Sequence, residues 1–319
     1  AGKDPAAIIG GRLPLIDGYG RYGAGREIVV EACEFSNTFL HLVPHIAVIL
    51  NIDADHLDFF KTMDNLKASF RKFALLTTHT IVANADDANT MQVLAGIDRY
   101  VVTFGQNEGA DYRAINVVEE RPAFFGFDVA ENGHIVEHIS LAAPGRHNVY
   151  NALAAYAAAR EAGCVPRECA SAIGEFKGAG RRFEILGERN GITIADDYAH
   201  HPAELAATLN TAKEMDFARV WAVFQPFTYS RTKLLLDDFA SALAIADKVV
   251  MTEIMGSRET NDNFNIYTKD LAAKIPDSVW YNTFDEVCAY VMKNAQPGDL
   301  VLTLGCGDIY KAAKKMMYD

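Results

Sequence analysis

The second half of the chain alternates short apolar runs with helix-length segments, and this alternation constrains the fold more than any other feature. We expect strands at 192–196, 219–224, 247–252, 278–281 and 299–304. We expect helices at 202–215, 231–245, 267–275, 283–294 and 307–316. Strands that alternate with helices of this length form βαβ units, in which successive strands pair in parallel. The pattern predicts an α/β domain with a mostly parallel sheet.

The first half predicts a second α/β domain that ends in a β meander. Apolar runs at 28–30 and 46–50 indicate strands, a helical pattern follows at 64–76, and short strands are expected at 79–84 and 100–104. The meander strands are expected at 112–119, 122–130 and 134–140, with a turn at Glu131-Asn-Gly133. The glycine-rich segment 176–180 is the expected hinge, so we place the domains at 1–178 and 179–319.

Polar side chains gather where two strands of the first half end. The strand at 46–50 is followed by a loop that contains Asp53, Asp55, His56 and Asp58. Glu31 follows the strand at 28–30. Parallel strands of an α/β sheet present their chemistry at their carboxyl ends. We therefore expect the two strands to be neighbours and to offer Glu31 and His56 to one cation. The alternative is that these acids cap the next helix or face solvent.

Two carboxamides open the alanine-rich helix that follows Pro144. Asn148 and Asn151 stand three residues apart, on one face of its first turn. Such a pair can read an adenine edge or fix a loop, and an N-cap role explains only one of the two.

Three strand ends of the second half also carry polar clusters, at 196–202, 225–232 and 305–308. Each is a strand-to-helix loop, where doubly wound sheets bind ligands. His200 and His201 are adjacent and point apart at a helix start, which favours capping or positioning over a shared metal. Arg182 lies just past the hinge, where it can clamp a phosphate or form a salt bridge between domains.

Composition excludes several classes of partner. The formal net charge of −12 argues against an extended nucleic-acid partner, because such sites need basic surface. The five scattered cysteines indicate reduced thiols and a cytoplasmic protein rather than a disulfide framework or a zinc site. The sequence contains no run of eighteen apolar residues, which is the length that a membrane-spanning helix requires. The chain opens without Met and as if within a domain, so we expect a fragment.

Several of these motifs, in this order, resemble the Mur ligases, the ATP-dependent amide-forming enzymes of peptidoglycan assembly. The resemblance covers nearly the whole chain and is carried by Glu31-Ala-Cys-Glu34, Asn51 to Asp58, Gly145 to Ala152, Arg181 to Glu184, Asp196-Asp197-Tyr198 and Gly305 to Ile309. It implies a central ATPase domain, here partial, followed by a Rossmann-like C-terminal domain. The family's phosphate loop and UDP-sugar domain are absent from the sequence. The resemblance therefore predicts a folded but inactive fragment.

The resemblance also implies roles for matching residues in binding Mg²⁺ and ATP. Glu31 and His56 would hold the metal and take part in catalysis. Asn148 and Asn151 would shape the ATP site, with Asn151 near adenine. Arg182 would be a catalytic residue that contacts the ATP phosphates. Asp197 would bind the ribose hydroxyls of ATP.

Within the family, the segments 196–202 and 224–232 most resemble the branch that joins L-alanine to UDP-N-acetylmuramate. Arg231 would orient the L-alanine carboxylate, and Tyr198 and His200 would contact substrate. Phe227 and Thr228 stand where relatives commonly carry His and Arg. This departure leaves open a murein-peptide ligase, whose amine donor is a peptide. A non-catalytic nucleotide-binding or scaffold protein is the alternative from another class. We expect a monomer or weak dimer.

Overall fold

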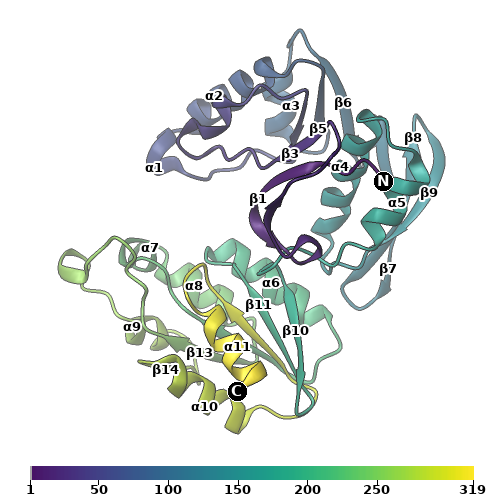
Figure 1. Cartoon of the computed structure of the whole chain (residues 1–319). Coiled ribbons are helices and arrows are strands. Elements are labelled where there is room, and N and C mark those ends of the chain that lie inside the picture. The colour runs from purple at the N-terminus through teal and green to yellow at the C-terminus, as the bar shows by residue number, and fades with distance from the viewer. Residues whose placement is uncertain (1) are drawn as a thin grey trace. The chain divides into compact units, whose positions relative to one another are not determined.

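The computed structural model describes residues 2–319, except for the side chains of Leu57 and Asp58, as two compact units (Figure 1). Unit 1 contains the residues up to Gly10 and Leu15–Lys177, and unit 2 contains Gly11–Pro14 and Gly178–Asp319. The glycine-rich segment 176–180 spans the boundary, and residues 11–14 join unit 2. The two units are described separately below.

Unit 1 is built on a six-stranded sheet with the order β4-β5-β6-β7-β8-β9. Its strands are β4 (Ile46–Ile49), β5 (Thr80–Asn84), β6 (Tyr100–Gly105), β7 (Tyr112–Arg121), β8 (Phe124–Glu131) and β9 (His134–Ser140). The first four strands are parallel, and β7 to β9 form the expected antiparallel meander. The turn between β8 and β9 places Asn132 and Gly133 at φ values of 49° and 83°. Two positive φ angles are what a two-residue hairpin turn of this kind requires.

A separate three-stranded sheet, ordered β2-β1-β3, contains the first strands of the chain. They are β1 (Ala6–Leu13), β2 (Gly18–Arg21) and β3 (Ile28–Val30). The expectation that β3 and β4 are neighbours in one sheet is wrong, because β3 pairs with β1 in the three-stranded sheet whereas β4 belongs to the six-stranded sheet. β1 pairs with β3 in parallel, in a register that sets Ala6 opposite Ile28. Ile28 and Val29 stay more than half exposed, so β3 is not a buried strand.

The helices of unit 1 are α1 (Leu57–Phe60), α2 (Met63–Leu76), α3 (Ala88–Leu94), α4 (His147–Glu161) and α5 (Pro166–Gly174), with short 3₁₀ turns at Pro14–Ile16 and Phe35–His41. Thr62 caps α2 by accepting a hydrogen bond from the Asn65 amide at 3.2 Å. The helix α4 buries Leu153 and Tyr156 in the same apolar cluster as Phe127 of β8. This packing fixes the first turn of α4 relative to the sheet.

Unit 2 has a six-stranded sheet with the order β10-β11-β15-β12-β13-β14. The strands are β10 (Glu184–Arg189), β11 (Ile192–Asp197), β12 (Val220–Phe224), β13 (Lys248–Thr252), β14 (Val279–Tyr281) and β15 (Leu300–Leu304). Five strands are parallel, and β10 is an antiparallel edge strand. All five residues of β12 and of β15 are buried, as expected for parallel strands covered on both faces.

Helices cover both faces of this sheet. They are α6 (Pro202–Glu214), α7 (Tyr229–Leu234), α8 (Leu236–Leu243), α9 (Thr268–Ala272), α10 (Phe284–Asn294) and α11 (Tyr310–Tyr318), with a 3₁₀ turn at Asn261–Asn263. Trp221 and Val223 of β12 share a core with α10 and α11, whereas the Phe224 ring contacts Phe239 of α8 at 5.5 Å. The single helix expected at 231–245 is broken at Leu235, whose ψ of 27° departs from helical geometry.

His138 lies between two carboxylates on the meander of unit 1. Its Nδ1 lies 2.7 Å from Asp128 Oδ1, and its Nε2 lies 3.0 Å from Glu120 Oε1. Hydrogen bonds to Asp128 and then to Glu120 raise the pKa of His138. A hydrogen bond from Asn116, followed by that from His138, lowers the pKa of Asp128. His138 likewise lowers the pKa of Glu120. The protonated imidazole therefore joins three strands.

We predict that this cluster contributes fully to stability between about pH 4.5 and 6.5, the ordinary pKa values of Glu and His. The raised pKa means that the His138 contribution is complete below 6.5 and is lost as the pH rises through the folded value. The lowered carboxylate pKa values mean that their contribution is lost only at more acidic pH. His138→Gln should cost on the order of 0.5–1 kcal/mol at pH 6 and less at pH 9 in urea unfolding. The exposed His134→Gln is the control, and an equal cost of His138→Gln at both pH values would contradict the assignment.

Candidate functional site

Unit 1 brings Glu34, Asp55 and His56 together beside the end of β4. His56 Nε2 lies 3.4 Å from Glu34 Oε1 and 3.6 Å from Asp55 Oδ2. Among the described residues, this is the one group of three metal-ligating side chains whose donor atoms all lie within 4.8 Å of one another. Two carboxylates and an imidazole are a chemically suitable donor set for a divalent cation.

Two side chains from the start of α3 hold the backbone of this loop in place. Asp87 accepts a hydrogen bond from the Ile52 amide at 3.1 Å, and Asn89 donates to the Ile52 carbonyl at 2.7 Å. His56 itself has a φ of 52°, and its ring lies 4.8 Å from that of Phe35. The loop after β4 is thus tied to the start of α3, which follows the neighbouring strand β5.

Glu31 makes a different contact from the one that its position in sequence suggests. Its carboxylate accepts a hydrogen bond from the Gly10 amide at 2.6 Å, across the β1–β3 pair. A Cβ atom at Gly10 would lie 2.4 Å from Glu31 Oε1, so a larger residue at position 10 would require the Glu31 carboxylate to move. The acids beside His56 are Glu34 and Asp55, which the sequence analysis did not select. Glu34 belongs to the same motif as Glu31, and Asp55 precedes His56. The side chain of Asp58 lies outside the described residues.

The two carboxamides of α4 form a pair on its first turn. Asn148 donates to the Pro144 carbonyl at 2.7 Å and accepts from Asn151 Nδ2 at 3.0 Å. Arg146 is the N-cap residue, so Asn148 does not cap the helix. Asn148 fixes the preceding turn and positions Asn151, whose side chain is exposed to solvent.

In unit 2, two buried carboxylates at the end of β11 organise the segment 181–183. Arg181 Nε donates to Asp196 Oδ2 at 2.8 Å, while Asp197 accepts from the amides of Phe183 and Ala199, both at 2.7 Å. Burial raises the pKa of Asp197, and these amides oppose the rise. Both oxygens of Asp197 are therefore engaged by backbone.

Arg182 makes no hydrogen bond to the two buried carboxylates, because Arg181 and Phe183 donate to them instead. It is exposed, and its guanidinium lies 5.7 Å from the centre of the Tyr198 ring. Within the described part of the chain it has no ion pair, whereas Arg181 is paired with Asp196. Of the two adjacent arginines, Arg182 is the one that is free to meet an anion.

Tyr198, His200 and Arg231 share the neighbourhood of Arg182. The rings of Tyr198 and His200 lie 5.5 Å apart. Burial lowers the pKa of His200, and the charges of Arg231 and Arg182 lower it further against Glu204. Arg231 Nη1 is buried and has no hydrogen-bond partner among the described residues. A buried guanidinium N–H that lacks an acceptor is costly, and a hydrogen-bond acceptor placed there would remove the cost. Next to them, His201 caps α6, as expected.

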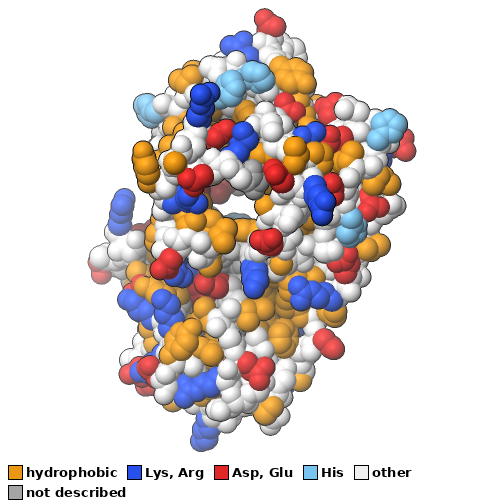
Figure 2. All heavy atoms as spheres, turned by 45° about the vertical axis from the view of Figure 1, so that its right-hand side comes forward, with side chains coloured by type: hydrophobic (Ala, Val, Ile, Leu, Met, Phe, Trp, Pro, Cys, Tyr) orange, Lys and Arg blue, Asp and Glu red, His pale blue; other side chains and the backbone are white. Residues whose placement is uncertain are grey.

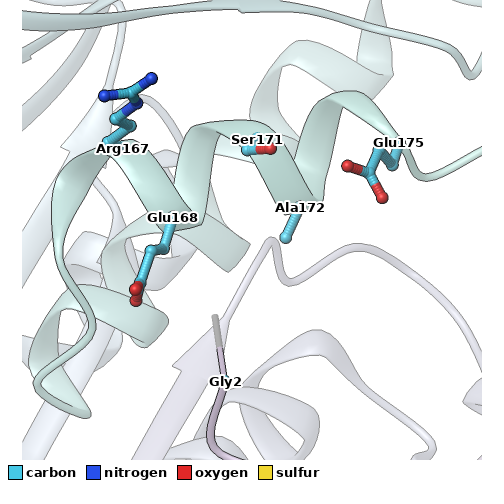
Figure 3. Close-up of a pocket in the computed structure, with 6 residues that line it drawn as sticks. All are labelled: Gly2, Arg167, Glu168, Ser171, Ala172 and Glu175. Atoms are coloured by element: carbon cyan, nitrogen blue, oxygen red, sulfur yellow. The ribbon is translucent and has the colours of Figure 1, made fainter.

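Two cavities lie apart from these groups. One, of about 390 Å³, runs along α5 and is lined by Gly2, Arg167, Glu168, Ser171, Ala172 and Glu175. Figure 3 shows these side chains spread along the helix rather than converging on a point. The other, of about 340 Å³, lies in unit 2 beside Glu253. Figure 2 shows acidic and basic side chains interspersed over the visible face.

The sequence matches two family profiles, the Mur ligase middle domain over residues 26–159 and the Mur ligase, glutamate ligase domain over residues 181–307. A UDP-N-acetylmuramate–L-alanine ligase from Caldanaerobacter subterraneus is 44% identical over 99% of this chain and 70% of its own length. A relative of the same name from Acetivibrio thermocellus is 41% identical over 99% of this chain and 69% of its own length. The chain belongs to the Mur ligase family.

Solved Mur ligases share the architecture. The UDP-N-acetylmuramate–alanine ligase of Thermotoga maritima has a TM-score of 0.81 at 28% identity, over 99% of this chain and 68% of that one. The MurF ligase of the same organism, in complex with ADP, has a TM-score of 0.75 at 17% identity, over 99% of this chain and 73% of that one. The expected family and α/β fold are confirmed. No helix in the described residues is long and apolar enough to cross a membrane.

We predict that Asp197→Ala frees the 181–183 turn. The amides of Phe183 and Ala199 would lose their acceptor, and each lost hydrogen bond is worth roughly 1–3 kcal/mol. Hydrogen exchange at these two amides should therefore accelerate roughly 10- to 100-fold. Asp216→Ala, at an exposed position after α6, should leave both rates unchanged. Unaltered protection in Asp197→Ala would show that the carboxylate does not hold the turn.

Proposed function

We propose that this chain serves the ATP-dependent ligation of L-alanine to UDP-N-acetylmuramate in peptidoglycan precursor synthesis. The single observation that carries the proposal is 44% identity to a ligase of that name over 99% of the chain. Relatives at 38–41% identity carry the same name. Unit 1 acts as the ATP-binding domain and unit 2 as the C-terminal domain.

The reaction requires activation of a carboxylate, because its oxygen is a poor leaving group. Transfer of the γ-phosphoryl group of ATP gives an acyl phosphate and ADP. The amine then attacks the acyl carbon, the C–N bond forms, and inorganic phosphate leaves. Phosphoryl transfer asks the protein mainly for positioning and for neutralisation of charge. The exposed Arg182, which has no ion pair among the described residues, suits that second task.

In unit 1, the residues proposed to hold Mg²⁺ are His56 and Glu31, with Glu34 and Asp55 as further oxygen ligands. The contacts of Glu34 and Asp55 with His56 support a cation at this loop. A bound Mg²⁺ neutralises developing charge on the phosphoryl oxygens. Asn148 and Asn151 are proposed to line the adenine site, where the exposed amide of Asn151 offers both a donor and an acceptor.

In unit 2, Arg231 is proposed to bind the carboxylate of L-alanine, with Tyr198 and His200 beside it. The buried Nη1 that lacks a partner supports this role. The lowered pKa of His200 keeps its imidazole neutral above its ordinary value of 6.5. A neutral imidazole does not compete with Arg231 for the substrate anion. Asp197 is proposed to contact the ribose hydroxyls of ATP in addition to holding its two backbone amides.

The ligase activity is measured on the natural protein that contains residues 1–319. We expect phosphate release that requires ATP, UDP-N-acetylmuramate and L-alanine. His56→Ala should lower kcat by at least about 100-fold, since removing one stabilising group at a charged transition state costs roughly 3 kcal/mol. His41→Ala, at an exposed position in the same unit, is the control. Release driven by a murein tripeptide instead of L-alanine would replace the proposed amine donor, and a fully active His56→Ala would remove His56 from the site.

Arg231 allows a sharper test, because its role in binding can be separated from stability. Arg231→Met should change the free energy of unfolding by less than about 1 kcal/mol, since no hydrogen bond of the side chain is lost. The same variant should raise the KM for L-alanine by at least about tenfold. Arg219→Met is the matched comparison, because Arg219 pairs with the buried Asp299 at 2.6 Å. It should cost about 3 kcal/mol of stability. An unchanged KM in Arg231→Met would exclude Arg231 as the carboxylate-binding residue.

A further inference from the structure

The cavity of about 340 Å³ in unit 2 lies at the carboxyl ends of three neighbouring parallel strands. Gln225 reaches it from the end of β12, Glu253 from β13 and Phe284 from beyond β14. Open α/β sheets bind ligands at this edge. The volume falls within the usual range of small-molecule sites, about 300–1,000 Å³. None of the residues proposed above for metal, nucleotide or amino acid lines this cavity.

The cavity contains one carboxylate whose charge is not compensated. Glu253 is half-buried, and no hydrogen bond or ion pair involves its side chain among the described residues. Burial raises the pKa of Glu253. The second acid of the cavity, Asp308, is already paired with Lys311 at 2.7 Å. Burying a carboxylate without a partner is unfavourable, so a ligand that supplies positive charge would relieve the cost.

One wall of the cavity is formed by close contacts between the loop after β15 and the ends of β12 and β13. Gln225 is only 7% exposed, and its Oε1 accepts a hydrogen bond from the Asp308 amide at 2.9 Å. A Cβ atom at Gly307 would lie 2.5 Å from Gln225 Oε1 and 2.6 Å from Met255 Sδ. Glycine at 307 therefore lets the loop after β15 approach the ends of β12 and β13. The Gln225–Asp308 hydrogen bond and this close approach fix one wall of the cavity.

The lining indicates the class of ligand. Ile254, Met255 and Phe284 supply apolar surface beside the Glu253 carboxylate. A metal ion is disfavoured, since the one group of three ligating side chains found in the described residues lies in unit 1. An organic cation with a short apolar body matches both the charge and the surface. We propose that this cavity binds a small aliphatic ammonium compound, with Glu253 as its counter-ion.

Two sources share this chemistry. One is the amine donor of a ligation reaction, which presents an ammonium group before it reacts. The other is a separate amine that acts as an effector. The site itself stands on the geometry of unit 2 and does not depend on the proposed function.

Direct binding to the intact chain tests the site without any turnover. Titration calorimetry with propylammonium chloride should give saturable binding, and the neutral isostere 1-propanol should bind at least about tenfold more weakly. Glu253→Gln should weaken propylammonium binding by at least about tenfold. Glu214→Gln, at an exposed position at the end of α6, removes the same charge and should have no effect. Circular dichroism confirms that both variants are folded.

Equal binding of propylammonium and 1-propanol to the natural chain would overturn the proposal, and this comparison needs no variant. Full propylammonium affinity in a folded Glu253→Gln would overturn it as well. Displacement of propylammonium by L-alanine would identify the site as one for the amine donor. Propylammonium binding that L-alanine does not displace would identify an amine site separate from that of the amine donor. Because ligase activity enters none of these measurements, failure of this site and failure of the proposed function are separate results.

Discussion

The burial of carboxylates at strand ends is the constraint on which unit 2 depends. An ionised carboxylate removed from water is costly unless hydrogen-bond donors surround it. Asp196 and Asp197 are 2% and 6% exposed, and each takes one donor from segment 181–183, beside Thr303 for Asp196 and the Ala199 amide for Asp197. Arg181 and Phe183 take left-handed φ values of 60° and 47° to supply them. The desolvation of two acids therefore determines the path of the chain after the hinge and leaves Arg182 outside.

The need of buried charges for hydrogen-bond partners also distinguishes the charged groups of unit 2 that have such partners from those that lack them. Asp299 is buried at the start of β15, yet Arg219, Trp221 and the Gln296 amide all donate to it. Burial opposes its ionisation, but these donors outweigh burial and lower its pKa. Arg231 Nη1 and the Glu253 carboxylate have no such partners among the described residues. These two groups, one partly buried cation and one half-buried carboxylate, differ in this respect from Asp299.

Sequence patterns predicted the central strands and the edge strands β4, β9 and β14, but they missed β1, β2 and β10, for a physical reason. β12 and β15 are continuous apolar runs because parallel strands are buried on both faces. The edge strand β10 mixes charged residues with a glycine and has no such signature. β1 was missed because Gly10 and Gly11 interrupt it. That omission had consequences, since β1 is the strand that pairs with β3 and donates the Gly10 amide to Glu31.

Spacing along the chain located the loop of His56 but not its partners, because side-chain direction depends on the local backbone. The turn that follows Glu34 contains Ser36 and Asn37 at φ values of 55° and 60°, and no periodicity in the sequence encodes where it aims that carboxylate. The result is an open cluster in which the Asp55 side chain is 76% exposed. In unit 2, Asp197 accepts two backbone amides from different segments, whereas Asp55 accepts, among the described residues, only the adjacent His56 amide, at 2.7 Å. The fold alone therefore brings these three donor groups within 4.8 Å of one another, and it leaves the cluster open to solvent.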